Sequence, residues 1–149
     1  MLKAEDIMTK EVITVSPEVT VEKAAKILSE NNISGVPVVD NGELKGIISE
    51  KDLIVKDKKL HFPDYIPFLD GIIYLDNYKK FEKEFKKFIA VNVEDLMTED
   101  VVTISPDTPV DEIATLMVEK EVNRIPVVEE GKIAGIVTRA DLVRDLASI

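Results

Sequence analysis

The sequence aligns with itself when it is shifted by 89 positions. Residues 6–53 pair with residues 95–142 without a gap, and 18 of the 48 paired positions are identical. A gap-free internal match of this length indicates two copies of one supersecondary unit. A unit of about 50 residues buries too little surface to be stable alone, so we expect the two copies to pack together.

Each copy has the same order of secondary-structure signals. A short β-rich stretch comes first, at residues 12–15 and 101–104, and a Ser-Pro pair ends it. Apolar residues spaced i, i+3, i+4 and i+7 then predict a helix. In the two helices these residues are Val21, Ala24, Ala25 and Leu28, and Val110, Ile113, Ala114 and Met117.

The helix starts and the hairpins that follow them also have local signals. Thr20 or Thr108 is a suitable N-cap, and Pro109 is well placed near the first helical position of the second helix. Two short strands then flank a tight turn, which is Asn41-Gly42 in the first copy and Glu130-Gly131 in the second. Asn-Gly is a strong hairpin signal.

With a final helix after the hairpin, the predicted order is β-α-β-β-α, twice. This order defines a mixed α/β (α+β) fold in which the two units pack sheet to sheet, with one shared core and a pseudo-twofold axis. The expected division is a first repeat at 1–54, an inserted loop and helix at 55–91, and a second repeat at 92–149.

Composition narrows the possible partners. The formal net charge is -10 and the pI about 4.6, so neither nucleic-acid binding, which needs a positive face, nor adhesion to anionic lipid is expected. The absence of cysteine excludes disulfides and thiolate metal sites. No apolar run reaches the roughly 20 residues that span a bilayer, and the N-terminus lacks a signal-peptide apolar region. We therefore expect a cytoplasmic protein.

The end of each repeat carries a hydroxyl and a carboxylate three positions apart. The segment "GIISEKDL" places Ser49 before Asp52, and "GIVTRADL" places Thr138 before Asp141. Such a pair is close to a capping box, in which it only satisfies the start of a helix. The same pair can also bind a ligand, and the two roles are compatible.

These motifs resemble those of tandem CBS domains (the cystathionine β-synthase type), a pair of which is called a Bateman module. The resemblance covers residues 1–54 and 92–149, and it implies a stand-alone regulatory module rather than a catalyst. The other motifs on which the resemblance is based are "DIMT" and "DLMT", "ITVSPE" and "TISPD", and "VPVVD" and "RIPVVEE".

The resemblance also implies ligands and site residues. Similar modules bind AMP, ADP, ATP, S-adenosylmethionine or methylthioadenosine in clefts between the repeats, and no further cofactor is required. The motif Asp holds the ribose hydroxyls and the Ser/Thr reaches ribose or phosphate, which implies ligand-binding roles for Ser49, Asp52, Thr138 and Asp141. One such charge-assisted hydrogen bond contributes about 1.5–3 kcal/mol, and a helix start suits phosphate.

The two clefts are not expected to be equivalent, because the repeats differ where charge matters. Gly35 aligns with Arg124, and Glu50 aligns with Arg139. In similar modules a basic residue just before the "IPVV" strand, the position of Arg124, reaches ligand phosphate. We therefore predict that the Asp141 cleft prefers the phosphorylated ligand, and that the first cleft, with Gly35 and Glu50, suits a neutral or cationic adenosyl group or binds no ligand.

Two alternatives to this charge assignment stay open. The two arginines could instead pair with surface acids such as Glu121 or Glu129. Lys10 or Lys51 could supply a phosphate contact in the first cleft, because such contacts can cross between repeats.

The insert at 55–91 has no counterpart in the repeat and contains all eight aromatic residues. Three phenylalanines at i, i+4 and i+7 in its second half predict an amphipathic helix over 77–89. The insert either packs as a satellite of the main core or serves as a lid or partner surface, and a membrane contact is not favoured. His61 and Asp64 supply too few ligands for a metal site.

An enzyme is not favoured. Asp52 and Asp141 belong to different repeats and clefts, so they do not form an acid–base pair, and no nucleophile lies beside a histidine. Neither a P-loop nor GxGxxG is present. No catalytic residue is assigned, and the competing interpretation is an interaction scaffold or dimerisation module with no physiological nucleotide ligand.

A homodimer and an unidentified protein partner in trans are expected. The helices that begin at Val21 and Val110 are apolar on one face, and the last helix carries Leu142, Val143 and Leu146. A C2 contact would bury the same patch of both subunits.

Overall fold

The computed structural model describes residues 1–57 and 90–148, with no account of the side chains at 55–57. The expected helix at 77–89, the aromatic residues and His61 therefore lie outside the described residues. The elements are α1 (Ala4–Ile7), α2 (Val21–Asn31), β1 (Gly35–Asp40), β2 (Glu43–Ser49), α3 (Glu50–Asp57), η2 (Val93–Asp95), α5 (Val110–Lys120), β3 (Arg124–Glu129), β4 (Lys132–Thr138) and α6 (Arg139–Ala147).

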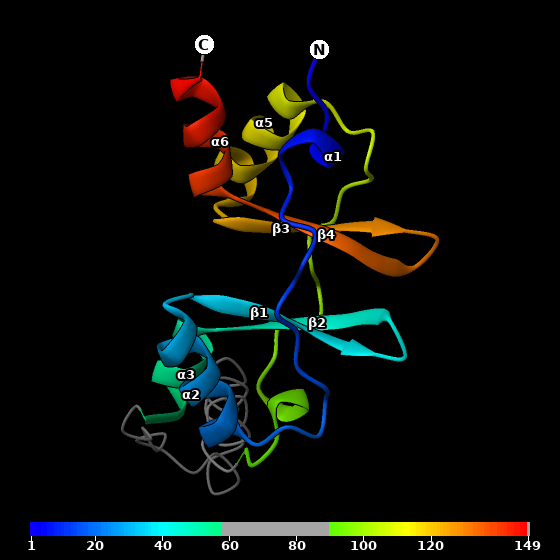
Figure 1. Cartoon of the computed structure of the whole chain (residues 1–149). Helices are drawn as coiled ribbons and strands as arrows, with labels where there is room; N and C mark the ends of the chain where they lie inside the picture. The colour runs from blue at the N-terminus through cyan, green and yellow to red at the C-terminus, as the bar shows by residue number, and fades with distance from the viewer. Residues whose placement is uncertain (58–89, 149) are drawn as a thin grey trace, which may run out of the picture.

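Each repeat forms one β-hairpin with helices on its outer side (Figure 1). The antiparallel hairpins β1–β2 and β3–β4 lie next to each other in the middle of the molecule, in the strand order β1-β2-β4-β3. One residue pair, Glu43 with Lys132, joins β2 to β4. The helices α2 and α3 lie at one end, and α1, α5 and α6 lie at the other, together with both chain termini. This arrangement confirms the predicted fold class.

The two hairpin turns have the backbone that their sequences predict. Asn41 and Gly42 have φ angles of 53° and 82°, and Glu130 and Gly131 have 51° and 79°. Two successive positive φ angles define a type I′ turn, whose twist matches that of the flanking strands. The glycine is required at the second position because an L side chain rarely adopts this conformation.

The first β-rich stretch of each repeat does not form the expected third strand. Val15 makes one isolated parallel bridge to Val38, and Ile104 makes the equivalent bridge to Val127. The ladder ends there because the Ser-Pro pair follows at once, and proline has no N–H to donate to a neighbouring strand. The residues before the bridge are thereby left to line the space between the repeats.

The segment that begins each repeat in the sequence packs on the other repeat. Ala4 in α1 is buried with Ile113 and Ile125 of the second repeat, whereas Val93 and Leu96 are buried with the first repeat. The buried residues in the described part of the chain thus form two clusters rather than the one shared core that was expected. The exchanged segments connect the clusters and hold the repeats together.

Backbone hydrogen bonds fix each exchanged segment against a strand. Thr9 and Ile136 exchange two bonds of 2.9 and 3.0 Å, and Thr98 and Ile47 exchange two of 2.9 Å. Next to these pairs, Cβ atoms on the motif glycines would lie 2.7 Å (Gly46) and 2.5 Å (Gly135) from the sulfurs of Met97 and Met8. Glycine begins both "GIIS" and "GIVT" because the methionine of the other repeat packs directly on it.

The helix caps differ between the repeats. Thr20 caps α2 and its hydroxyl accepts a hydrogen bond from the Lys23 N–H at 3.2 Å, as predicted. In the second repeat the N-cap is Pro109, which agrees with the prediction that it lies near the first helical position. Thr108 does not cap α5, because its hydroxyl accepts instead from the Ser105 N–H at 3.1 Å.

Candidate functional site

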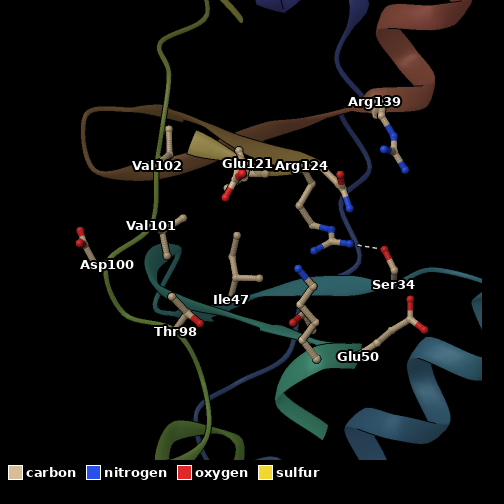
Figure 2. A pocket seen from close by; sticks show the side chains of 14 residues that line it. Ser34, Ile47, Glu50, Thr98, Asp100, Val101, Val102, Glu121, Arg124 and Arg139 are labelled. Atoms are coloured by element: carbon tan, nitrogen blue, oxygen red, sulfur yellow. Dashed lines mark hydrogen bonds between the residues drawn. The ribbon is translucent and has the colours of Figure 1, made fainter. Parts of the chain in front are cut away.

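Two clefts lie between the repeats, each with a volume of about 440 Å³. We name them the Ser49 cleft and the Thr138 cleft after the motif hydroxyl that lines each. The Ser49 cleft, drawn in Figure 2, is lined by Ser34, Ile47, Ser49, Glu50, Lys51, Thr98, Asp100, Val101, Val102, Glu121, Val122, Asn123, Arg124 and Arg139. The Thr138 cleft is lined by Thr9, Glu11, Val12, Ile13, Asn32, Ile33, Ser34, Gly35, Pro37, Asn123, Arg124, Ile136, Thr138, Arg139 and Ala140.

The two clefts are equivalent under the 89-residue shift. Each one combines the start of a motif helix, α3 or α6, with the crossing segment and the helix end of the other repeat. In the Ser49 cleft these are Thr98 with residues 100–102 and residues 121–124, and in the Thr138 cleft they are Thr9 with residues 11–13 and residues 32–35. Both repeats therefore build both clefts.

The two motif carboxylates cap helices in this structure. Asp52 Oδ2 accepts from the Ser49 N–H at 2.9 Å and from its hydroxyl at 3.1 Å. Asp141 Oδ2 accepts from the Thr138 N–H and hydroxyl at 2.8 and 3.1 Å, and Asp141 Oδ1 accepts from Arg144 at 3.1 Å. Both aspartates are at most 6% exposed and belong to neither cleft lining. They hold the hydroxyls that do line the clefts.

Arg124 lies between the two clefts and lines both. Its guanidinium reaches from β3 across to the first repeat, where Nη2 donates to the Ser34 hydroxyl (Figure 2). A Cβ on Gly35 would lie 2.7 Å from Arg124 Nη1. Burial lowers the pKa of the Arg124 guanidinium, and the negative charges of Glu50 and Asp52 oppose that shift.

Arg139 also lines both clefts, from the first position of α6. Across residues 1–57 and 90–148 the ion pairs join Lys26 to Glu30, Lys45 to Glu43 and Arg144 to Asp141. The alternative that Arg124 or Arg139 pairs with Glu121 or Glu129 is therefore wrong for this structure. Both guanidiniums are directed to the space between the repeats.

Other charged positions are distributed differently from the sequence interpretation. Gly35 was expected in the first cleft, but it lines the Thr138 cleft, because each cleft takes its helix end from the opposite repeat. Lys51 lines the Ser49 cleft, as one alternative required, whereas Lys10 lines neither. Sequence reasoning missed Ser34 and Asn123, which line both clefts and which only the pseudo-twofold packing brings together.

Each cleft contains four branched aliphatic side chains. They are Val12, Ile13, Ile33 and Ile136 in the Thr138 cleft, and Ile47, Val101, Val102 and Val122 in the Ser49 cleft. Such side chains suit an apolar ring system, and the hydroxyls and guanidiniums of the same linings suit its polar substituents.

Residues 1–57 and 90–148 contain no group of three or more His, Cys, Asp or Glu side chains that could hold a metal ion. No helix within these residues is both long and apolar enough to cross a membrane.

The fold and the paired clefts are those of a tandem CBS-domain protein. The model of the CBS domain matches residues 4–58 and 93–148, so the chain belongs to the CBS-domain family. It is 32% identical over 150 residues to the protein MJ1426 of Methanocaldococcus jannaschii, with 95% of this chain and 89% of that protein covered.

Two solved structures that resemble the chain contain adenosyl ligands. CBSX2 in complex with AMP has a TM-score of 0.84 and 27% identity, with 100% of this chain and 99% of that one covered. The CBS domain pair of protein MJ0100, in complex with 5-methylthioadenosine and S-adenosyl-L-methionine, has a TM-score of 0.72 and 28% identity, with 99% and 98% covered.

Proposed function

We propose that this protein binds an adenosyl compound of the AMP, ADP, ATP or S-adenosylmethionine type in its clefts and acts on a partner protein in trans, in the cytoplasm. The observation that carries the proposal is the pair of equivalent clefts, each placed at the Ser/Thr that begins a helix. The AMP and S-adenosyl-L-methionine complexes of two similar structures support the same ligand class.

The cleft chemistry suits the three parts of such a ligand. The aliphatic side chains would take the adenine ring. The hydroxyl of Ser49 or Thr138 would contact ribose or phosphate, and the first N–H groups of α3 or α6 would favour an anion. Arg124 and Arg139 would bind phosphate through parallel N–H bonds.

The ribose role of Asp52 and Asp141 remains a prediction that the capping geometry permits. An ionised carboxylate has about four acceptor positions, so Asp141 can accept from a ribose hydroxyl while it still accepts from Thr138. Binding of this kind needs no chemical change of the ligand, and we propose a regulatory module rather than an enzyme. Nucleotide incubated with the protein should elute from chromatography unchanged.

A thermal-shift and calorimetry screen tests this function. AMP, ADP, ATP, S-adenosylmethionine and methylthioadenosine are titrated separately. A ligand at 100 times its dissociation constant stabilises the fold by about 2.7 kcal/mol, which for a chain of this size raises Tm by roughly 5–10 °C. Mass spectrometry of small molecules released from the denatured protein provides an independent readout. The function is refuted if no ligand of the set binds by either method.

A pair of variants tests the site assignment. Asp141→Asn should reduce the ligand-induced shift, because a neutral amide is a weaker acceptor for ribose hydroxyls. Asp145→Asn removes the same charge one turn further along α6 without removing the hydrogen bonds between Asp141 and Thr138, and it is the matched control. An undiminished shift in Asp141→Asn would show that the ligand binds elsewhere.

We also propose that the protein is a homodimer through α3 and α6. Of the residues expected in that contact, Val21 is buried and Leu142 half-buried, so they are not available. Three apolar side chains on these two helices are exposed: Ile54 at 68%, Val143 at 59% and Leu146 at 67%. This exposed face also supports the second candidate function, an interaction scaffold.

Light scattering tests the dimer. The wild type should give twice the chain mass of 16.6 kDa, and Val143→Lys should shift it toward the monomer, because a charge would be buried in the contact. The same change at exposed Val118 of α5 is the control for the choice of helix. A wild type of 16.6 kDa at micromolar concentration would refute the dimer.

A further inference from the structure

The two clefts share their arginines. Four residues line both clefts: Ser34, Asn123, Arg124 and Arg139. Both arginines that line the Thr138 cleft are therefore the same two that line the Ser49 cleft. A guanidinium that binds an anion in one cleft is not free to bind a second anion in the other.

The position of Arg124 follows from an asymmetry at the pseudo-twofold axis. Gly35 and Arg124 are equivalent under the 89-residue shift, and they face each other: a Cβ on Gly35 would lie within 3.0 Å of three guanidinium atoms. A large side chain on both strands would compete for this space. Because Gly35 has no side chain, the space is occupied by the half-buried guanidinium of Arg124, which donates a hydrogen bond to the Ser34 hydroxyl.

The remaining lining charges cannot replace the arginines. Without them the Ser49 cleft has three carboxylates, Glu50, Asp100 and Glu121, against one cation, Lys51. The Thr138 cleft has the single carboxylate of Glu11 and no other cation. Each cleft is therefore net negative unless the shared arginines face it, and the Thr138 cleft has less negative charge to overcome.

We propose that the shared Arg124 and Arg139 limit the chain to one tightly bound phosphorylated ligand, which occupies the Thr138 cleft, while the Ser49 cleft remains able to bind an uncharged adenosyl ligand. This inference rests on the proposed function. It adds a rule of occupancy: a nucleotide and a neutral adenosyl compound bind together, whereas two nucleotides compete for the same two cations.

Titration calorimetry with AMP and methylthioadenosine, one anionic and one neutral, tests the rule on the whole 149-residue chain. AMP should saturate at one per chain, with any second AMP at least tenfold weaker. Methylthioadenosine should still bind, at one per chain, to protein already saturated with AMP. Two AMP molecules of equal affinity per chain would overturn the inference while the proposed function stands.

Substitutions at the shared arginines test their role. Arg124→Met and Arg139→Met keep much of the side-chain volume, and each should weaken AMP about ten- to a hundredfold, the value of one charge-assisted contact. Methylthioadenosine affinity should stay within twofold, which shows that the variants are folded. Lys26→Met removes the same charge from an exposed position of α2 outside both cleft linings and should change neither affinity.

A variant that should gain affinity for a second AMP gives a stricter test of the occupancy rule. Gly35→Arg supplies a second guanidinium. The atoms that its Cβ meets belong to the flexible end of Arg124, so we expect Arg124 to move aside and the two side chains to face different clefts. The second AMP should then bind at least tenfold more tightly than it does to the wild type. An unchanged second site in this variant, or unchanged AMP affinity in both methionine variants, overturns the inference.

Two further results separate the inference from the function on which it rests. If methylthioadenosine binds and AMP does not, the proposed function stands and the occupancy rule is wrong. If neither binds, both fail. Thr138→Val and Ser49→Ala decide the cleft: AMP binding should weaken more in the first, and the reverse would overturn the assignment to the Thr138 cleft.

Discussion

The two repeats of this protein have the same backbone and different charges. The same hairpins, type I′ turns and glycine contacts recur 89 residues apart. The turns close each hairpin, and the motif glycines let it pack on the segment exchanged from the other repeat. The cleft residues are under no such constraint, and there Gly35 faces Arg124 and Glu50 corresponds to Arg139. Packing preserves the symmetry of the module, and the two clefts are where it is lost.

The exchanged segments give the largest test of this comparison. Leu96 is 1% exposed in the first repeat's cluster, whereas its equivalent, Ile7, is only half-buried. Leu96→Ala should lower the free energy of unfolding by about 2–5 kcal/mol, as for other buried leucines, and Ile7→Ala by less. Urea unfolding followed by circular dichroism measures both. Equal losses would show that the two exchanged segments are equally important to stability.

The motif glycines give the next largest effect. Gly46→Ala and Gly135→Ala each force a Cβ against a methionine sulfur and the backbone oxygen of Thr98 or Thr9. We expect each to lower the free energy of unfolding by about 1–3 kcal/mol through overpacking. The same unfolding measurement applies, and two nearly equal values would support the equivalence of the repeats. A loss in one repeat only would contradict it.

Short sequence motifs made much of the secondary structure predictable. The Asn41-Gly42 turn, the cap at Thr20 and the alignment of the two motif helices all depend on neighbours in sequence. The packing of Met8 and Met97 on the hairpin of the opposite repeat could not be predicted. The internal alignment of the sequence shows that a segment recurs, but it does not show which hairpin that segment contacts. The same limit applies at the site: Arg124 was identified as a cleft residue, but only the packing at the axis shows that it serves both clefts.

The helix caps give a smaller difference between the repeats. Thr20→Ala removes the hydroxyl that accepts from Lys23 N–H and should lower the free energy of unfolding by about 1 kcal/mol. Pro109, its equivalent, has no side-chain acceptor to lose. Thr20→Ser keeps the hydroxyl and is the matched control. Thermal unfolding of the three proteins should rank Thr20→Ala lowest, and a Tm equal to the wild type would exclude a contribution from this cap.

The smallest effect is expected from the turn after the Ser-Pro pair. The Ser105 hydroxyl donates to Asp107, which, with backbone hydrogen bonding and the charge of Lys3, lowers the pKa of that carboxyl. In the described residues no hydrogen bond joins the equivalents, Ser16 and Glu18. A carboxyl whose pKa is lower in the folded state contributes stability above its unfolded pKa of about 3.9, and the contribution is lost as the pH falls through the folded value.

Asp107→Asn should therefore reduce the difference in stability between pH 6 and about pH 3, while Glu18→Gln, which removes a carboxylate at the equivalent position, should reduce it less. Asp107 is fully exposed, so solvent screens the interaction and the change should be small. Urea unfolding at a series of pH values for the two variants and the wild type measures it. A larger effect of Glu18→Gln would mean that the acid sensitivity of the two turns is the reverse of what their hydrogen bonds imply.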